Sequence, residues 1–364
     1  MTTPTGSAPA IPDSVLVIGS GLIGASIGLA LRAAGLEVWL DDADTGALRV
    51  AVERGAGRSG LPPGDPDLVV VAVHPAATAQ VVEEALRLYV NATVSDVSST
   101  KTELQREIEA RGVDLGRFVP GHPLAGREVS GPAAARADLF ADRVWALAPG
   151  KTTDPRRTAS MAAVVALLGA VPVLTTPEEH DRAVALTSHT PQVVASLVAA
   201  GLHSLGENEV RLSGQGLRDV TRLAASDPDL WTEILTSNAG PVAAALDGLI
   251  GRLTSVRDGL VSGRTGTVAV RGALASGVAG HQRVPGKHGT AAVSYAVVPV
   301  VVADRPGELG RLFADAGLTG VNLEDVRIEH AQGRPTGLVE LEVRPEAAEQ
   351  LAAGLRATGW DVRA

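Results

Sequence analysis

His122, in the segment Pro120-Gly-His122-Pro-Leu-Ala-Gly126, could act as a positioned acid–base group. The proline after it restricts its backbone. A neutral imidazole near pH 7 can take a proton from a hydroxyl group while a hydride leaves the same carbon. Spacing alone leaves a second interpretation open, in which His122 is a packed loop histidine.

A glycine-rich turn supplies a second candidate for chemistry. An aliphatic run from Val15 stops at a glycine, and a helical pattern follows at once. In a dinucleotide site the first glycine allows the turn, the second lets the backbone approach a pyrophosphate, and the third packs helix on strand. The helix N-terminus then holds the phosphates. The alternative is an ordinary strand–turn–helix unit. The predicted cofactor contacts are Gly19, Ser20, Gly21, Leu22, Ile23 and Gly24.

Further cofactor contacts are expected where later strands end. Asp41 and Asp42 lie about 20 residues past the glycines, where a carboxylate binds the adenosine ribose. We favour Asp42, and two acids here favour NAD over NADP because they repel a 2′-phosphate. Val73 and His74 end an apolar run, although such a histidine is more often structural. Ser98 follows the next strand, where hydroxyl residues also serve as helix N-caps.

Alternating strands and helices must position these groups. The pattern predicts an α/β fold with a doubly wound, Rossmann-type sheet. From residue 177 to about 261 the period is helical and rich in Ala, Leu and Val, which predicts an all-α substrate and dimerisation domain. Strands are expected at 15–19, 38–40, 67–73, 93–97, 117–119, 143–148 and 170–174, with a helix at 154–168.

The last part of the chain has a different pattern. Residues 263–289 are rich in glycine and basic residues, and we interpret them as a linker or ordered loop. The order βαββαβ follows, which predicts a ferredoxin-like unit. The expected domains are a flexible tail at 1–12, a nucleotide-binding domain at 13–176, a helical domain at 177–262, a linker at 263–292 and the C-terminal unit at 293–364.

Composition limits the classes of function. The chain has 364 residues, a formal charge of −9 and no cysteine. The acidic balance argues against nucleic-acid and anionic-membrane partners, and the lack of cysteine excludes thiolate metal sites. No apolar run reaches the ~18–20 residues of a membrane span. The first ten residues lack the pattern of a signal peptide. We therefore expect a soluble cytoplasmic protein that binds no metal.

Four motifs together resemble the prephenate/arogenate dehydrogenases of tyrosine biosynthesis. They are the glycine turn, Asp96-Val-Ser-Ser99-Thr-Lys101, the His122-Pro-Leu-Ala-Gly126 segment with Ser130-Gly131, and the stretch from Gly216 through Thr221-Arg222 to Trp231. The C-terminal unit, with Asp304-Arg-Pro-Gly307 and Val321-Asn322, resembles an ACT domain, a module that senses amino acids.

The resemblance implies a role for several residues. His122 would remove the proton of the substrate C4 hydroxyl, Ser99 would support that hydroxyl, and Glu128 would gate the site. Arg222 would pair with a substrate carboxylate, since a guanidinium can bind a carboxylate through two hydrogen bonds. Trp231 would pack near the pocket; on its own it could equally staple a helix start.

One position departs from the family pattern. Many members read Ser-His-x-Pro-His, where the second histidine helps to hold the substrate, but this chain has Gln192 there. An amide cannot carry charge, so the preference between prephenate, with a keto side chain, and arogenate, with an amino side chain, stays open. His189 remains, and we interpret it as structural.

The implied function is NAD-dependent oxidative decarboxylation of prephenate to 4-hydroxyphenylpyruvate by a homodimer. The alternatives are arogenate oxidation and a non-catalytic sensor of NAD and amino acids. A β-hydroxyacid dehydrogenase is disfavoured, because residues 177–261 contain no lysine. An aromatic amino acid would act as effector on the C-terminal unit near Asp304, Pro306, Gly307 and Asn322; a plain dimerisation module is the other interpretation.

Overall fold

The computed structural model describes residues 11–125, 129–284, 295–330 and 335–363. It divides into two compact units, residues 1–254 and 255–364, each described here by itself. Most of the predicted N-terminal tail lies outside the described residues.

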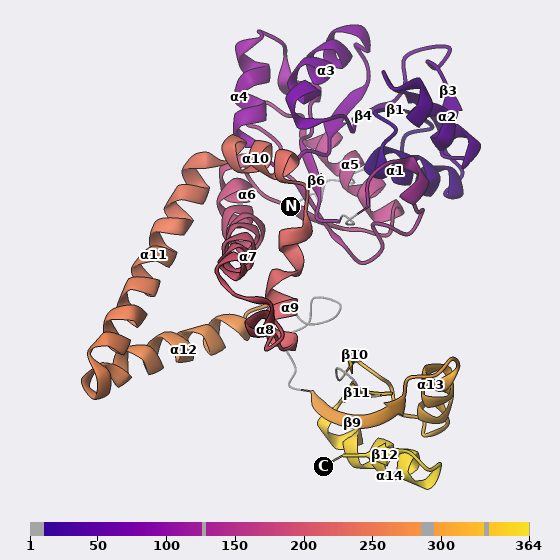
Figure 1. Ribbon diagram of the computed structural model, residues 1–364. Helices are drawn as coiled ribbons and strands as arrows, with labels where there is room; N and C mark the ends of the chain where they lie inside the picture. Colours follow the sequence, from indigo (N-terminus) through magenta and orange to yellow (C-terminus); the bar gives the residue numbers. More distant parts are fainter. Residues whose placement is uncertain (1–10, 126–128, 285–294, 331–334, 364) are drawn as a thin grey trace, which may run out of the picture. The chain divides into compact units, whose positions relative to one another are not determined.

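A five-stranded sheet forms the centre of the first unit (Figure 1). All of its pairings are parallel, and the strand order is β3-β2-β1-β4-β5. The chain reverses direction across the sheet between β1 and β4, which is where doubly wound folds bind ligands. The predicted fold class is confirmed for this part. The strands are β1 (Ser14–Ile18), β2 (Glu37–Asp41), β3 (Arg58–Ser59), β4 (Leu68–Val71) and β5 (Thr93–Asp96).

Helices cover both faces of this sheet, as the uninterrupted apolar strands require. Val15 and Val17 of β1 belong to the core that contains residues of α1, while Leu16 between them belongs to the core under α3 and α4. Alternation along one strand therefore supplies both cores. The helices are α1 (Leu22–Ala33), α2 (Thr45–Glu53), α3 (Pro75–Leu88) and α4 (Thr102–Ala110).

A second sheet of three strands carries the candidate base. Its order is β6-β7-β8, with β6 antiparallel to β7 and β7 parallel to β8. The strand predicted at 117–119 is wrong: residues Leu115–Arg117 form the 3₁₀ turn η1, and Phe118 makes a single parallel bridge with Val94. The strand comes later, so His122 lies within a strand. The elements are β6 (Gly121–Pro123), η2 (Pro132–Ala134), β7 (Val144–Leu147), α5 (Pro155–Leu167) and β8 (Val171–Leu174).

The segment from 177 onward is helical, as predicted (Figure 1). Its first helix begins with a capping box between Thr176 and Glu179. The elements are α6 (Pro177–Val184), the π-helical turn η3 (Ala185–His189), α7 (Thr190–Gly201), η4 (Leu202–Ser204), α8 (Glu207–Val210), α9 (Gln215–Thr221), η5 (Arg222–Ala225), α10 (Pro228–Ser237) and α11 (Ala239–Val261). Among the described residues, the helical run Pro177–Ser204 meets the length and hydropathy of a membrane span, and 33% of its apolar window is buried.

The expected linker contains a helix. Residues after α11 form η6 (Gly263–Gly266) and α12 (Thr267–His281), so the interpretation of this part as a loop is wrong, while its role as a linker stays a prediction. A Cβ built on Gly266 would lie 1.9 Å from the carbonyl oxygen of Gly259, so the close approach of these two backbones requires glycine. The remainder of that stretch, 285–294, lies outside the described residues.

The C-terminal elements follow the predicted βαββαβ order. The sheet order is β10-β11-β9-β12, and every pairing is antiparallel. Both helices contribute to one core: Leu312 and Leu355 are fully buried with Val300 of the sheet. This is a ferredoxin-like arrangement. The elements are β9 (Ala296–Ala303), α13 (Glu308–Leu318), β10 (Asp325–His330), β11 (Thr336–Val343), η8 (Pro345–Ala347), α14 (Ala348–Ala357) and β12 (Asp361–Val362).

Candidate active site

The glycine turn between β1 and α1 has the shape that a pyrophosphate needs. Gly19 has φ +99°, and a Cβ there would lie 2.3 Å from the carbonyl oxygen of Ala72. A Cβ on Gly24 would lie 1.8 Å from the carbonyl oxygen of Gly19. A Cβ on Gly21 would meet no heavy atom within 4 Å, so the backbone there is open to an approaching group. Leu22 and Ile23 form the first turn of α1, which follows directly.

Asp42 is the acid that faces this turn. Its carboxylate accepts hydrogen bonds from the Ser20 backbone N–H at 2.5 Å and from the Ser20 hydroxyl at 2.7 Å. Asp41 is the last residue of β2 and is exposed. The acid preferred from the sequence is thus the one beside the glycines. These residues fit the adenosine end of a dinucleotide, although their contact with a ribose stays a prediction.

The other predicted cofactor contacts lie at the ends of β4 and β5. Val73 borders the glycine turn, since a Cβ on Gly19 would lie 2.9 Å from its backbone nitrogen. His74 precedes α3, and its Nδ1 lies 3.4 Å from Glu233 Oε2 on α10. The Ser98 hydroxyl makes a short hydrogen bond to the Asp96 carboxylate.

A buried ion pair links the Asp96-to-Lys101 motif to the strand of the candidate base. Both side chains are fully buried, with Lys101 Nζ 2.5 Å from Asp96 Oδ2. Lys101 Nζ also donates to the Gly121 carbonyl at 2.7 Å, and the Gly121 N–H donates to Asp96 Oδ1 at 3.2 Å. The pair therefore holds the residue before His122 from both of its backbone groups. The motif alone did not indicate a role for either charge.

Two further residues extend His122 into a chain of polar contacts. His122 Nδ1 lies 2.9 Å from His180 Nε2, and His180 Nδ1 lies 2.8 Å from Asp181 Oδ1. Asp181 also accepts the backbone N–H groups of Lys101 at 2.9 Å and of Thr102 at 2.8 Å. His180 is 3% exposed and Asp181 2% exposed. The chain connects α6 of the helical part to the loop before α4.

These contacts determine which nitrogens carry protons. A carboxylate only accepts, so His180 Nδ1 carries a hydrogen. A neutral His180 then accepts at Nε2, and His122 must donate from Nδ1. In that state His122 Nε2 has a free lone pair, as a general base requires. Burial, then the charge of Lys101 and the neighbouring His180, holds the pKa of His122 well below its usual value. Burial opposes the ionisation of Asp181, but the hydrogen bonds from His180 and Thr102 outweigh it, and its pKa is lowered.

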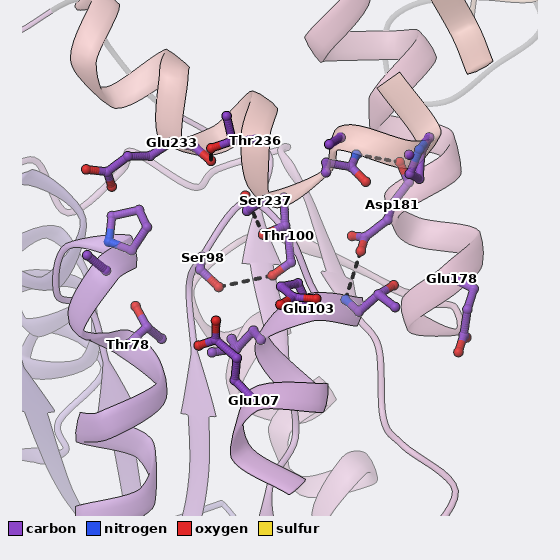
Figure 2. A pocket seen from close by; sticks show the side chains of 18 residues that line it. Thr78, Ser98, Thr100, Glu103, Glu107, Glu178, Asp181, Glu233, Thr236 and Ser237 are labelled. Carbon is purple, nitrogen blue, oxygen red and sulfur yellow. Dashed lines mark hydrogen bonds between the residues drawn. The ribbon is translucent and has the colours of Figure 1, made fainter. Parts of the chain in front are cut away.

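Asp181 borders a cleft of about 870 Å³ in the first unit (Figure 2). Figure 2 shows the Thr100 and Ser237 side chains meeting in it, with a hydroxyl–hydroxyl distance of 3.1 Å. The acids that line it are Glu103, Glu107, Glu178, Asp181 and Glu233. Ser98 contributes to its wall. This acidic lining does not suit an anionic substrate.

His189 and Trp231 lie together beside the chain of polar contacts. Their rings meet edge to face, with centroids 6.1 Å apart. His189 is 1% exposed and its Nδ1 lies 3.1 Å from the Asn238 side-chain nitrogen. Asn238 also donates to the Asp181 carbonyl at 2.8 Å. Burial lowers the pKa of His189 to about 4. These contacts suit the structural interpretation of His189, which stays a prediction.

Gln192 ties α7 to the turn that contains Arg222. It is 5% exposed, and its Nε2 donates to the Leu223 carbonyl at 3.0 Å. Its Oε1 is buried and has no hydrogen-bond partner among the described residues. Arg222 is exposed, begins η5 and directly precedes Leu223. The structure thus brings Gln192 close to the predicted carboxylate-binding residue.

Some predicted residues are placed less closely, and two residues of the chain of polar contacts, His180 and Asp181, were not predicted. Ser99 is half-buried on the loop after β5, while Glu128 lies outside the described residues. Neither His180 nor Asp181 was singled out from the sequence. The signal available was a run of charged residues, Glu178 to Arg182, that contains this histidine and acid at the start of an otherwise apolar helical domain.

The predicted effector residues lie at opposite ends of the C-terminal sheet: Asp304, Pro306 and Gly307 follow the end of β9, whereas Asn322 precedes β10 at the end where β9 begins. Gly307 has φ +92° and caps α13, and Asp304 and Pro306 precede it on an exposed loop. Asn322 is exposed and its side-chain nitrogen donates to Glu324 at 3.0 Å. Their contact with an effector stays a prediction.

A doubly wound sheet with an open glycine turn, together with a candidate base on a strand of the second sheet, is the arrangement of a nucleotide-dependent oxidoreductase. Family descriptions agree. The prephenate dehydrogenase nucleotide-binding domain matches residues 27–174, and the prephenate dehydrogenase dimerization domain matches residues 176–269. A probable prephenate dehydrogenase of Streptomyces niveus is 39% identical over 361 residues, covering 95% of this chain and 98% of the relative. The chain belongs to the prephenate dehydrogenase family.

Solved structures show the same relationship. A prephenate dehydrogenase from A. aeolicus, in complex with hydroxyphenyl propionate and NAD+, has a TM-score of 0.65 and 26% identity, covering 73% of this chain and 97% of that one. The arogenate dehydrogenase of Synechocystis has a TM-score of 0.64 and 26% identity, covering 73% and 98%. By sequence, the Bacillus subtilis prephenate dehydrogenase is a further relative; it is 31% identical over 67% of this chain and 69% of that protein.

Proposed function

We propose that the protein catalyses the NAD-dependent oxidative decarboxylation of prephenate to 4-hydroxyphenylpyruvate, a step towards tyrosine. The observation that carries this is His122, whose Nε2 has a free lone pair because His180 and Asp181 fix its tautomer. The family relationship supplies the reaction class, and the A. aeolicus relative was solved with NAD+.

The chemistry divides between cofactor and protein. When bound, NAD+ accepts the hydride that leaves C4 of the substrate ring. His122 Nε2 removes the proton of the C4 hydroxyl as the carbon–oxygen bond becomes a carbonyl. The C1–carboxylate bond then breaks, its electron pair enters the ring, and CO2 leaves. The ketone oxygen becomes a phenolate, which takes back a proton from His122 to give the phenol, and the gain of aromaticity makes the sequence effectively irreversible.

Other residues would hold the substrate. Arg222 would bind a carboxylate with its guanidinium, and Ser99 would support the C4 hydroxyl. Trp231 would close one side of the pocket, next to His189, which its ring already contacts. Glu128 would gate the entrance. Gly19, Gly21, Gly24 and Asp42 would hold the adenosine half of NAD, and Val73, His74 and Ser98 would border the nicotinamide half.

Arogenate is the second candidate substrate, and Gln192 favours it. Its Nε2 donates to the Leu223 carbonyl, which leaves the buried Oε1 as a hydrogen-bond acceptor with no partner in the described part of the chain. An unpaired buried acceptor costs about 1–3 kcal/mol, and a donor would recover part of this. The ammonium group of arogenate is a donor, whereas the keto oxygen of prephenate only accepts.

The test is the appearance of reduced nicotinamide with purified protein, with prephenate and arogenate offered separately, each with NAD and NADP. We expect turnover with NAD and release of CO2. The His122→Asn variant should lose nearly all turnover while it still binds NAD. Nucleotide binding without turnover of either substrate would refute the enzyme and favour a sensor of NAD and amino acids.

We further propose that the C-terminal unit is an ACT-type regulatory domain that binds an aromatic amino acid. Its ferredoxin-like strand order supports this, as does the exposed loop of Asp304, Pro306 and Gly307. By linkage, tyrosine or phenylalanine inhibits only if it binds the low-activity arrangement better. We expect a cytoplasmic homodimer, consistent with the matched dimerization domain. A titration of tyrosine and phenylalanine against turnover tests the regulation.

A further inference from the structure

Among the described residues, the recorded hydrogen-bond partner of His122 Nδ1 is His180, whose Nε2 lies 2.9 Å away. It is buried on α6, 58 residues away in sequence, and its other ring nitrogen lies 2.8 Å from Asp181. Two imidazoles and a carboxylate thus stand in a row, each within hydrogen-bond distance of the next. Such a row can pass on a proton as well as orient a ring.

The surroundings favour a positive charge at one end of this row. Lys101 stands near His122, and its charge disfavours an imidazolium there. At His180 the nearest charged partner is the carboxylate of Asp181. The other titratable and charged groups that face the row are Lys101 with its partner Asp96, and His189 in η3. A proton taken by His122 is therefore more stable after it has moved one ring further.

We propose, on the basis of the dehydrogenase function proposed for His122, that His180 is a positioning residue that also accepts a proton in the oxidation step. The C4 hydroxyl proton moves to His122 Nε2, and the Nδ1 proton of His122 moves to His180 Nε2 in the same step. His122 ends neutral, with its hydrogen on Nε2, and His180 ends as an imidazolium paired with Asp181. When the ring becomes aromatic, His122 Nε2 returns its proton to the phenolate oxygen and the Nε2 proton of His180 moves back to His122 Nδ1, which restores the starting state.

His180→Gln tests proton acceptance separately from orientation. A glutamine oxygen can accept the hydrogen bond from His122 Nδ1, but an amide does not take up the proton. We expect kcat to fall roughly 10- to 100-fold, within the usual range for lost acid–base assistance. The KM for the substrate and the Kd for NAD should stay within about twofold, because an unmoved His122 ring keeps the pocket intact.

The pH profile supplies a readout that a purely structural role would not move. In the proposed relay, a proton that enters the row from solvent can pass to His180 and leave the His122 hydrogen on Nε2, which blocks the base. Without His180, only His122 titrates, and Lys101 and burial disfavour its charge. The acid limb of kcat should therefore move to lower pH in His180→Gln, together with a lower plateau. His203→Gln, which alters an exposed histidine of η4, is the matched control and should leave both unchanged.

A measurement on the wild type covers the case in which His180→Gln does not fold. Single-turnover rates in mixtures of light and heavy water should depend on the deuterium fraction along a curve, because two protons move together. A straight line, or wild-type kcat and pH profile in a folded His180→Gln variant, would overturn the relay alone. A wild type that turns over neither prephenate nor arogenate would overturn the dehydrogenase function and the relay together.

Discussion

Lys101→Met is the most informative change to the architecture around the base. The lysine side chain is fully buried, and its ammonium group contacts the Asp96 carboxylate, the Ser98 hydroxyl and the Gly121 carbonyl. Methionine has a similar volume but no charge, so the variant fills the same space. What it removes is the partner of a buried carboxylate.

The magnitude follows from what remains around Asp96. Its oxygens keep the hydrogen bonds from the Ser98 N–H at 2.8 Å, from the Ser98 hydroxyl and from the Gly121 N–H at 3.2 Å, but no cation. Removing one partner of a buried ion pair typically costs about 3–5 kcal/mol. At about 2–4 °C per kcal/mol for a unit of this size, the melting temperature should fall by about 6–20 °C.

Urea unfolding followed by circular dichroism measures the loss, with Asp96→Asn/Lys101→Met as the matched double variant. The double variant should be more stable than Lys101→Met alone, because it no longer buries an unpaired charge. The pKa of His122 should rise in Lys101→Met, since a nearby positive charge has gone, and the acid limb of kcat should move to higher pH. A loss of less than about 1 kcal/mol would refute the assignment of the pair as the clamp on β6.

Three further changes test other parts of the site. Gly24→Ala should destabilise the fold by about 1–3 kcal/mol and weaken NAD binding, because its methyl group would lie 1.8 Å from the Gly19 carbonyl oxygen. Arg222→Ala should raise the KM for the substrate about 10- to 100-fold, the equivalent of one charge-assisted contact, with a smaller change in kcat. The pKa of His189 is about 4 in the folded protein against 6.5 in the unfolded chain, so between these values the unfolded chain binds the proton more tightly. The free energy of unfolding therefore decreases as the pH is lowered from 6.5 to 4, and His189→Gln should remove up to about 3 kcal/mol of that decrease.

Each of these has an outcome that contradicts it. Unchanged nucleotide affinity in Gly24→Ala, measured by fluorescence titration, would separate the glycine turn from cofactor binding. An unchanged KM would remove Arg222 from the pocket. Parallel stability curves for wild type and His189→Gln across pH 4–6.5 would show that His189 titrates normally.

Local patterns in the sequence were enough to predict much of the fold. The glycine spacing, the apolar runs of β1 and β4 and the βαββαβ order of the C-terminal unit each depend on contacts between near neighbours, and all three are present. The prediction for the stretch after α11 was wrong, because its glycine content favours a loop, whereas residues 267–281 are helical. Helix propensity is a weak preference that context overrides.

At the site, the sequence alone predicted some of the residues but not the contacts between them. His122 and Asp42 could be singled out, because each stands next to a recognisable turn or strand end. The partner of His122 could not, since His180 lies 58 residues away and reaches it only when α6 packs beside the loop before α4. The same holds for Gln192, whose amide orientation depends on a carbonyl 31 residues away at Leu223. Residue types and local turns are determined along the chain, but tautomers, buried ion pairs and unpaired acceptors depend on distances across it, which only the tertiary structure decides.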